Sequence, residues 1–286
     1  YSRFLKLLIT TRMYSSSHIK VSCWTISLIA RSNSSSTRIF LKSLDLSHLM
    51  VYNGTILTKD YIMELSESTL EVLKNFASIN SNIVFNEGNV VKTVSEAKNV
   101  LSTSTLDVDF PRKFGIYDLN EFLSTLSLLD TPRLKFEDNF VIVSDGSGRS
   151  RIKYHYSDTD ILTSPSKDII MPEAEVTFTL ERETLLKIKR AASVLGHTEV
   201  SVSTSGNVMN LSVIDNNDKT SNAFSIDVDG KFEDSNFSFV FNISNLKMID
   251  GDYDVSISSK LISHFVNKSS GIEYWVALEK TSTYGA

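Results

Sequence analysis

Apolar residues recur at helical spacing in two segments of this chain, and the two segments resemble each other. "LSESTLEVLKNFASI" covers residues 65–79, and "LERETLLKIKRAASV" covers residues 180–194. They align without gaps, so that Thr69-Leu70 falls on Thr184-Leu185. Apolar residues three and four positions apart form one stripe on a helix. The pattern therefore predicts two equivalent amphipathic helices.

The segments that follow these helices alternate between apolar and polar residues, and they also match in pairs. Gly88-Asn89-Val90 aligns with Gly206-Asn207-Val208, each between alternating runs, as in a hairpin turn. Farther on, "FGIYDLNEFL" (114–123) resembles "FVFNISNLKM" (239–248), which predicts a strand, a capping residue and a short helix in each repeat, the second over residues 242–249. The sequence thus predicts a duplicated α+β unit with antiparallel sheets.

A connector without helical periodicity separates the two repeats. It holds Pro165 and Pro172 and is typical of an extended linker. We therefore expect a first domain over residues 63–162, a connector over 163–175 and a second domain over 176–286.

Residues 1–62 differ in composition from the rest of the chain. They are Ser-rich and carry eight Lys/Arg against two acids, whereas the remainder has 21 bases and 32 acids. Such a composition fits a transit peptide, but it also fits upstream sequence carried into an open reading frame. We expect the second, with residues 1–62 extraneous or disordered and translation starting at Met63, which would open the first well-patterned helix. Lys59-Asp60 can be encoded AAG GAY, which contains a ribosome-binding AAGGA shortly before the Met63 codon. A Lys59 codon of AAA would remove that sequence and with it the support for this start.

The segment 180–195 concentrates positive charge in a chain whose formal net charge is −5. Its apolar stripe comprises Leu185, Ile188, Ala192 and Leu195. The cations lie off that stripe, opposite it or beside it: Arg182, Lys187, Lys189 and Arg190. Taken alone, this pattern is typical of an ordinary solvated helix face. The matching helix of the first repeat carries only Lys74, and the predicted helix 242–249 carries only Lys247.

The sequence contains no recognisable catalytic constellation. His155, His197 and His264 are isolated, and the single cysteine excludes an internal disulfide. "DNNDKT" (215–220) resembles a calcium loop, but Lys219 occupies a ligand position and no Glu closes the loop. We therefore predict a protein that is not an enzyme and that uses no metal or cofactor. No apolar run reaches the roughly 18–20 residues of a membrane-spanning helix.

Several longer strings resemble one known family. "LKNFASIN" (73–80), "IYDLNEFLSTLSLL" (116–129), "NLKM" with the "GDY" that follows it (245–253), and "YWVALE" (274–279) are similar to the sliding clamps of T-even-type bacteriophages, the polymerase accessory proteins of their replisomes. The resemblance runs in order from Met63 to the C-terminus.

The resemblance implies the DNA clamp fold, with two similar domains, each having an antiparallel sheet outside and two helices inside, and three subunits closed into a ring. It implies a homotrimer that encircles double-stranded DNA without sequence preference and tethers the DNA polymerase. It also implies an ATP-dependent clamp loader, contacts with late-transcription proteins, and a location in the cytoplasm of the infected bacterial host.

A channel around DNA gains from cations, because the phosphates carry dense negative charge. The expected DNA-facing residues are Lys74, Arg182, Lys187, Lys189, Arg190 and Lys247. Of these, Arg190 matches a basic position of the family, whereas the others follow from the helices and their faces. The first domain's helices are poor in bases, so either that half attracts DNA weakly or Arg112, Lys113 and Lys153 substitute.

Partners of such clamps insert a short apolar peptide into a pocket between the domains. The residues expected there are Ile169, Ile170, Met171, Tyr274, Trp275 and Val276, for which plain core packing is the alternative. Two rival functions stay open at this point. One is a duplicated protein-interaction scaffold that does not encircle DNA, and the other is an enzyme that uses Asp215 or Asp218.

Overall fold

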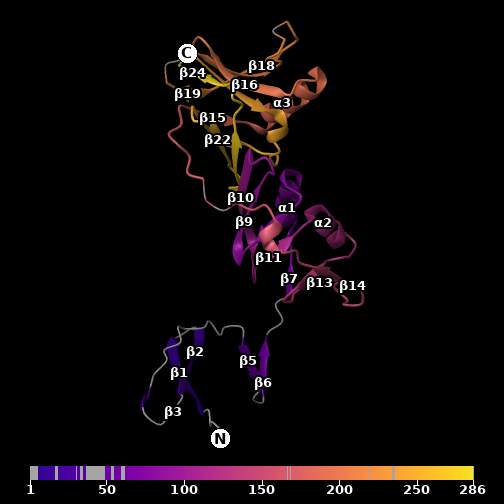
Figure 1. Cartoon of the computed structure of the whole chain (residues 1–286), viewed down its shortest axis with the longest axis vertical. Coiled ribbons are helices and arrows are strands. Elements are labelled where there is room, and N and C mark those ends of the chain that lie inside the picture. The colour runs from indigo at the N-terminus through magenta and orange to yellow at the C-terminus, as the bar shows by residue number, and fades with distance from the viewer. Residues whose placement is uncertain are drawn as a thin grey trace. The chain divides into compact units, whose positions relative to one another are not determined.

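A computed structural model describes residues 62–285 apart from 166, 168, 219, 234 and 235, together with short strands within residues 6–58. The chain divides into two compact units, Tyr1–Asp60 and Tyr61–Ala286 (Figure 1). The first unit contains three antiparallel pairs of strands. These are β1 (Lys6–Ser16) with β2 (Ile19–Ile29), β3 (Arg31–Ser32) with β4 (Ser35–Ser36), and β5 (Leu49–Tyr52) with β6 (Thr55–Thr58). The expectations that residues 1–62 are extraneous and that translation starts at Met63 stay predictions.

The second unit contains two repeats of the same order of elements. The first consists of β7 (Ile62–Glu64), α1 (Glu67–Ile79), β8 (Ile83–Phe85), β9 (Gly88–Val94), β10 (Val100–Phe110), β11 (Phe114–Ile116), α2 (Leu119–Ser127), β12 (Arg133–Phe136), β13 (Phe140–Ser144) and β14 (Arg151–His155). A 3-10 turn, η1 (Thr159–Ile161), begins the connection to the second repeat.

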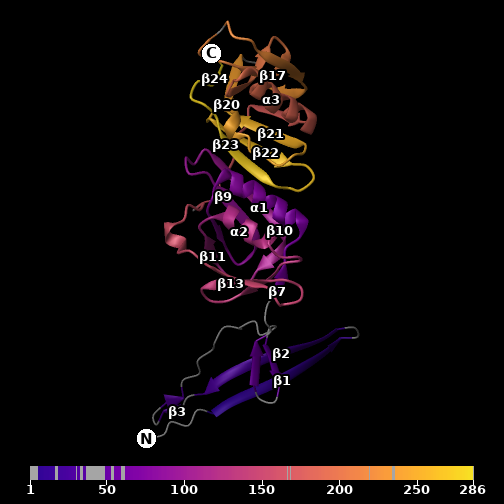
Figure 2. The ribbon, with the colours of Figure 1, turned by 90° about the vertical axis from the view of Figure 1, so that its right-hand side faces the viewer.

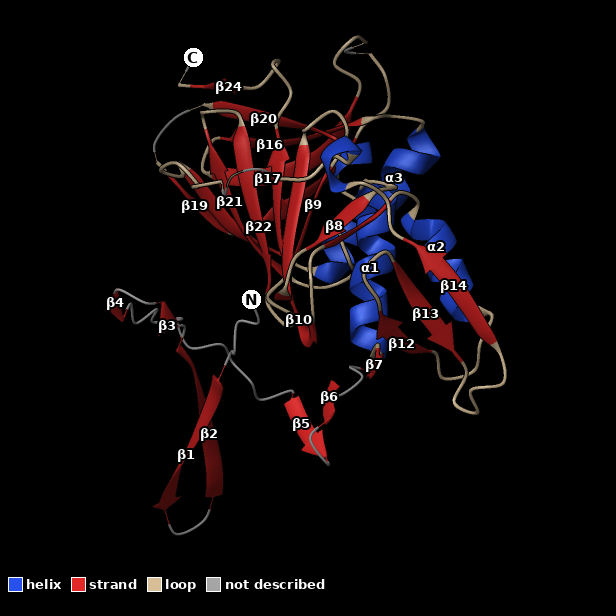
Figure 3. Cartoon of the chain, turned by 60° about the horizontal axis from the view of Figure 1, so that its bottom comes forward, coloured by secondary structure: helices blue, strands red, loops and turns tan. Residues whose placement is uncertain are grey.

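The second repeat consists of β15 (Val176–Leu180), α3 (Arg182–Leu195), β16 (Glu199–Ser205), β17 (Val208–Ile214), β18 (Phe224–Val228), β19 (Gly230–Phe232), β20 (Phe237–Asn242), the 3-10 turn η2 (Ile243–Asn245), β21 (Tyr253–Ser258), β22 (Ile262–Asn267), β23 (Glu273–Ala277) and β24 (Thr283–Tyr284). Figures 2 and 3 show α1, α2 and α3 close to the sheets. The expected α+β fold with duplicated antiparallel sheets is confirmed.

Local capping fixes where the two long helices begin and end. Ser66 is the N-cap of α1 and accepts a hydrogen bond from the Thr69 amide. Asp107 on β10 accepts further hydrogen bonds from the hydroxyls of Ser66 and Thr69, at 2.9 and 2.6 Å, so the helix start is tied to the sheet. These bonds lower the pKa of Asp107, the Thr69 bond most. Helix α3 ends at Gly196, whose φ of 70° is the left-handed conformation that glycine adopts without strain.

The two repeats join through one antiparallel pair of strands. Strand β10 of the first repeat pairs with β23 of the second, with Val100 opposite Val276 and Ser102 opposite Tyr274. The pairing produces one continuous sheet of order β19-β15-β21-β22-β23-β10-β9. We call this pairing the internal joint.

Side chains form a second layer at the internal joint. The Tyr274 hydroxyl donates to Asn75 Oδ1 at 2.8 Å and accepts from the Ile249 amide at 3.2 Å. Asn75 Nδ2 donates to the Lys247 carbonyl at 3.0 Å, and Lys247 Nζ donates to the Ser78 carbonyl at 2.7 Å. The last turns of α1 are therefore fixed to the segment that follows η2.

The expected second helix of the second domain, over residues 242–249, is not formed. Asn242 caps a turn of only three residues, and Leu246 and Met248 are both buried. Apolar residues two apart lie on the same face of extended chain rather than of a helix. The expectation of two helices in each domain is thus wrong for the second domain, which has α3 and η2. Met63 likewise does not open a helix, because it lies in β7, opposite Leu134 of β12.

Replacing Tyr274 by Phe tests the second layer of the internal joint. The substitution leaves Asn75 Oδ1 and the Ile249 amide without their partner, and an unsatisfied buried group costs about 1–3 kcal/mol. We expect the free energy of unfolding to fall by about that amount in a urea titration. Tyr117→Phe is the matched control, because Tyr117 is 65% exposed and its loss of a hydroxyl should change little. Equal effects of both variants would contradict the assignment.

Candidate functional site

Helix α3 buries the predicted apolar stripe and exposes cations on its other faces. Leu185, Ile188 and Ala192 are each at most 3% exposed, and Leu195 is half-buried. The side chains of Lys187 and Arg190 are exposed, although Lys187 Nζ lies 3.9 Å from a carboxylate oxygen of Glu183 one turn away.

The remaining two cations of α3 lie on the side of the helix that faces Asp250. Arg182 Nη2 is 3.3 Å from Asp250 Oδ2, an ion pair that the sequence pattern did not indicate. Burial lowers the pKa of Lys189, and the Asp250 carboxylate opposes that shift. Asp250 therefore offsets part of the positive charge on this side, and Arg190 and Lys187 remain the most open cations of the helix.

The two other helix-associated cations differ in their surroundings. Lys74 is exposed on α1, at the position that aligns with Lys189 in the repeat. Lys247 is exposed but lies beyond η2, and its ammonium binds the Ser78 carbonyl near the end of α1. Cations near a helix C-terminus are favourable because they meet unpaired carbonyls and the negative end of the helix dipole. Lys247 thus has a structural role at the internal joint, whatever else it contacts.

The suggested substitutes in the first repeat have contacts of their own. Arg112 forms an ion pair with Asp138 at 2.9 Å. Lys153 Nζ lies 3.9 Å from the centre of the Phe140 ring. Lys113 is exposed between β10 and β11. None of these three residues lies on a helix.

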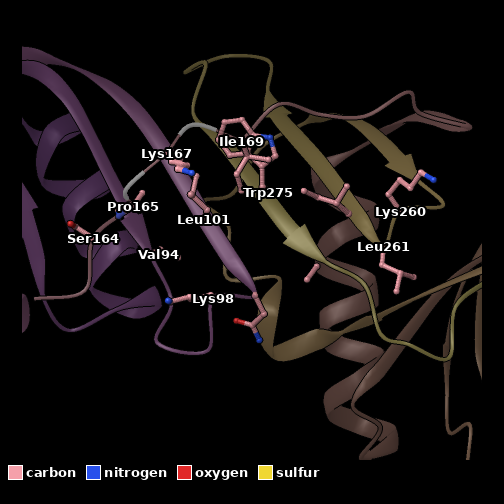
Figure 4. A pocket seen from close by; sticks show the side chains of 13 residues that line it. Val94, Lys98, Leu101, Ser164, Pro165, Lys167, Ile169, Lys260, Leu261 and Trp275 are labelled. Carbon is pink, nitrogen blue, oxygen red and sulfur yellow. The ribbon is translucent and has the colours of Figure 1, made fainter.

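A pocket of about 430 Å³ lies where the connector passes the internal joint (Figure 4). The connector contributes Ser164, Pro165, Lys167 and Ile169, and the joined strands contribute Leu101 and Trp275. The remaining lining residues are Val94, Lys98, Asn99, Lys260, Leu261, Ile262 and Ala277. Figure 4 shows Ile169 close to the Trp275 ring. The structure thus brings together two of the six residues expected at a pocket between the repeats.

The other four residues do not line the pocket. Tyr274 and Val276 are fully buried on the opposite face of β23, because successive side chains of a strand point to opposite faces. For these two residues the alternative of core packing is correct. Ile170 is 89% exposed, and Met171 is half-buried farther along the connector. Alternation along "YWVALE" could have separated Trp275 from its neighbours, but the contribution of Leu101 depends on pairing with a distant strand.

Trp275 packs against a second ring beside this pocket. Its ring stacks on His264, with centroids 4.6 Å apart, and His264 Nε2 lies 2.7 Å from a Glu273 carboxylate oxygen. Within the described residues, Trp275 Nε1 has no hydrogen-bond partner. An apolar wall with a fixed aromatic ring suits a short apolar peptide.

The connector is anchored at its far end by Glu175. The carboxylate accepts from the amide and the hydroxyl of Ser259, at 2.8 and 2.5 Å. Burial alone would raise the pKa of Glu175, but hydrogen bonds to the carboxylate, those from Ser259 foremost, together lower the pKa below its usual value of 4.5. The anchor therefore depends on the ionised carboxylate.

The described residues contain no group of three or more side chains that could hold a metal ion. Asp215 and Asp218, which one rival function required, each cap a local turn by accepting backbone amides two residues on. Lys219 lies outside the described residues. Among the described helices, none is long and apolar enough to cross a membrane.

Two family profiles match the two repeats of this chain. Residues 66–155 match the DNA polymerase processivity factor, and residues 177–280 match the C-terminal part of the gp45 sliding clamp. The sliding clamp of Vibrio phage KVP40 is 34% identical over 222 residues, covering 76% of this chain and 99% of the relative. The sliding clamp of Escherichia phage RB69 is 27% identical, covering 78% and 99%.

Solved structures share the fold at lower identity. The proliferating cellular nuclear antigen of Entamoeba histolytica matches with a TM-score of 0.56 and 15% identity, covering 77% of this chain and 99% of that one. The proliferating cellular nuclear antigen of A. fulgidus, solved with the C-terminal region of FEN-1 bound, matches with a TM-score of 0.58 and 16% identity, covering 78% and 99%. These likenesses confirm the clamp fold expected from the sequence.

Acidification should loosen the connector through Glu175. Because the folded-state pKa is lowered, the anchor is fully present above the usual value of 4.5 and is lost as the pH falls through the folded-state pKa below it. We expect amide hydrogen exchange of residues 169–174, corrected for intrinsic rates, to speed up over that range. Glu175→Gln should exchange fast at neutral pH and lose the pH dependence. An unchanged profile in that variant would exclude Glu175 as the anchor.

Proposed function

The chain belongs to the sliding-clamp family of T4-like bacteriophages, and on that premise we propose that three copies close into a ring around duplex DNA. Its function is that of a sliding clamp, a DNA polymerase processivity factor. A closed ring cannot leave DNA sideways, so a polymerase bound to it stays at high effective concentration near the primer end. This function needs no catalytic group in the clamp itself.

The proposal rests on the duplication of the chain. Its two repeats are already joined to each other by a pair of strands, and the same kind of pairing could join one copy to the next. Strand order β7-β12-β13-β14 in the first repeat corresponds to β15-β21-β22-β23 in the second. Strands β10-β9 likewise correspond to β18-β17. The internal joint uses β23 and β10, so their counterparts β14 and β18 are left as sheet edges. Pairing the edge β14 of one copy with the edge β18 of another repeats the same joint between subunits.

The helices support the assignment of the inner surface. Helices α1 and α3 carry exposed cations, whereas the chain as a whole is acidic. Long cationic side chains attract phosphates at any base sequence, which suits a slider. The DNA-facing set we propose is Lys74, Lys187, Lys189 and Arg190, with Arg182 and Lys247 weakened by their contacts with Asp250 and Ser78. The acidic remainder would repel DNA from the outer surface.

The pocket at the connector is the proposed docking site for the polymerase peptide, with Ile169 and Trp275 as its apolar wall. An ATP-dependent clamp loader that opens the ring, and late-transcription proteins, are further proposed partners. The protein would act in the cytoplasm of the infected bacterial host. The domain limits 63–162, 163–175 and 176–286 are part of the same proposal. A protein-interaction scaffold that does not encircle DNA is the alternative. A ring would slide off the ends when circular DNA is cut, whereas the scaffold predicts no such loss of bound protein.

Charge reversal on the equivalent lysines tests the DNA channel. Lys74→Glu with Lys189→Glu should keep the fold, because neither residue belongs to the apolar stripe. We expect at least tenfold weaker retention on circular duplex DNA, loaded with the phage's clamp loader and ATP, and a shallower dependence of binding on salt, since fewer counterions are released. Lys231→Glu with Lys280→Glu is the control pair, because it changes the net charge by the same amount at positions that do not lie on a helix. Equal losses in both pairs would contradict the channel assignment.

The docking pocket is tested by truncating its apolar wall. Trp275→Ala should weaken binding of the polymerase's short apolar clamp-binding peptide by at least tenfold, because aromatic anchors dominate such interfaces. Ile170→Ala is the control, since Ile170 is 89% exposed and does not line the pocket. Calorimetric titration measures both affinities. Unchanged affinity in Trp275→Ala, with the fold intact by circular dichroism, would place the docking site elsewhere.

A further inference from the structure

A short turn before β21 places two carboxylates against the start of α3. The N-cap of α3 is Glu181, whose side chain makes no capping hydrogen bond. Asp252 Oδ1 supplies the acceptor instead, because the Arg182 amide donates to it at 2.8 Å. Asp250 Oδ2 lies 3.3 Å from Arg182 Nη2. One arginine is therefore held twice, through its backbone by Asp252 and through its guanidinium by Asp250.

The rest of the second unit fixes the position of this turn. On one side, the Tyr253 hydroxyl donates to the Ile249 carbonyl, and the Ile249 amide donates to the Tyr274 hydroxyl at 3.2 Å. On the other side, the Lys268 amide donates to the Asp252 carbonyl at 2.9 Å. The turn is thus positioned by the internal joint and by the sheet, and its carboxylates cannot move far from α3.

The first repeat shows that such a turn does not need a carboxylate at the position of Asp250. Leu134 and Val255 are equivalent, because their partners in β7 and β15 fall together when the helices are aligned. Counting back equally from each, Asp250 falls on Leu129, an apolar residue that packs against the core. The fold therefore forms this connection with or without the acidic group.

The cation paired with Asp250 is likewise confined to the second repeat. Arg182 aligns with Glu67 at the start of α1. The second repeat therefore has a base on the helix and an acid in the turn, whereas the first has an acid on the helix and an apolar residue in the turn. A carboxylate that the turn does not require, and that occurs together with a cation, acts on that cation.

Asp250 also acts on a second cation of the same helix. Lys189 follows Arg182 by seven residues, which is close to two full turns, so both residues lie on one side of α3. Burial lowers the pKa of Lys189, and the negative charge of Asp250 opposes that shift. Both cations belong to the set proposed above to face DNA. Asp250 therefore lies among the groups that would meet the phosphates.

We infer that Asp250 sets how tightly the clamp holds DNA, by competing with the phosphates for Arg182 and Lys189. The inference rests on the ring and the DNA channel proposed above. A guanidinium binds carboxylates and phosphates through the same donors, so Arg182 can exchange one for the other. The Arg182 and Asp250 side chains are 56% and 51% exposed, and an ion pair so exposed is weak enough to open.

This competition suits a protein that has to move along DNA. Phosphates recur along the duplex, and a cation that binds one of them firmly must be released before it can bind the next. Asp250 offers Arg182 a partner during each such release, which lowers the barrier between neighbouring phosphates. Asp250 thus regulates the mobility of the clamp without itself binding DNA.

Removing the charge of Asp250 tests this role. In Asp250→Asn the amide keeps the size of the side chain but competes only weakly for Arg182. We expect the full-length chain to bind a labelled linear duplex of about 30 base pairs about threefold more tightly, with a salt dependence steeper by about one phosphate contact. Fluorescence anisotropy at several salt concentrations measures both quantities.

Asp254→Asn is the matched control. Asp254 pairs with Lys268 at 3.0 Å, so this variant removes the same charge and also frees a cation. Its exposed side chain points away from the face that holds its buried neighbours Tyr253 and Val255. Binding of the duplex should therefore not change. Equal tightening in Asp254→Asn and in the test variant would overturn the inference, because net charge alone would then explain the effect.

A double variant identifies the cation that Asp250 restrains. Adding Asp250→Asn to Arg182→Gln should tighten duplex binding by no more than about 1.5-fold, because the main group to be released is already gone. The full threefold gain in the absence of Arg182 would overturn the pairing.

The rate of sliding provides a readout that a merely structural role would not move. On stretched duplex DNA, loaded with the phage's clamp loader and ATP, labelled Asp250→Asn should diffuse about twofold more slowly than the unsubstituted chain. Unchanged diffusion would overturn the inference. If Lys74→Glu with Lys189→Glu also left duplex binding unchanged, the channel itself would be wrong. Weaker binding in that pair, without an effect of Asp250→Asn, would keep the channel and remove only the role of Asp250.

Discussion

The antiparallel pairing of β10 with β23 is the interaction on which the rest of this structure depends. It joins two repeats into one continuous sheet and fixes α1 to the segment after η2 through Asn75, Lys247 and Tyr274. The same pairing forms one wall of the connector pocket, since Leu101 and Trp275 face each other across it. The joint therefore positions both the helices that carry the cations and the pocket proposed as a docking surface.

One joint is formed inside the chain, between β10 and β23, and the counterparts of these two strands lie at sheet edges. The free edges β14 and β18 offer backbone groups that need partners, and edges of this kind pair with other chains unless they are covered. Here the two edges carry opposite charges, Arg151 and Lys153 on one and Asp227 on the other. Like edges are thus kept apart by repulsion, and unlike edges attract. Such selectivity would favour the proposed head-to-tail closure over random aggregation.

The distribution of charge matters more than its total. The chain is acidic, and carboxylates partly neutralise some of the cations on its helices. Asp250, for example, lies beside Arg182 and Lys189. A slider needs weak and uniform attraction rather than tight binding, because a deep electrostatic minimum would hold it at one place. Carboxylates beside the cations offset part of their attraction for DNA phosphates, so the net attraction is modest, in keeping with that requirement.

The repeat could be detected from the sequence alone, because helix periodicity, caps and hairpin glycines are local signals, and these determined the α+β class, α1, α2, α3 and the connector. The same local signals gave the cations of α3, whereas Trp275 was expected at a pocket only through the family resemblance. They failed at residues 242–249, where a capping Asn suggested a helix but the chain forms only the three-residue turn η2, followed by an irregular segment in which Leu246 and Met248 are buried. Strand alternation could have separated Trp275 from Tyr274, but no local signal could find Leu101, Asp250 or the contact of Lys247 with Ser78. Those depend on which strand lies beside which, and such pairings between distant residues are decided only when the whole sheet has formed.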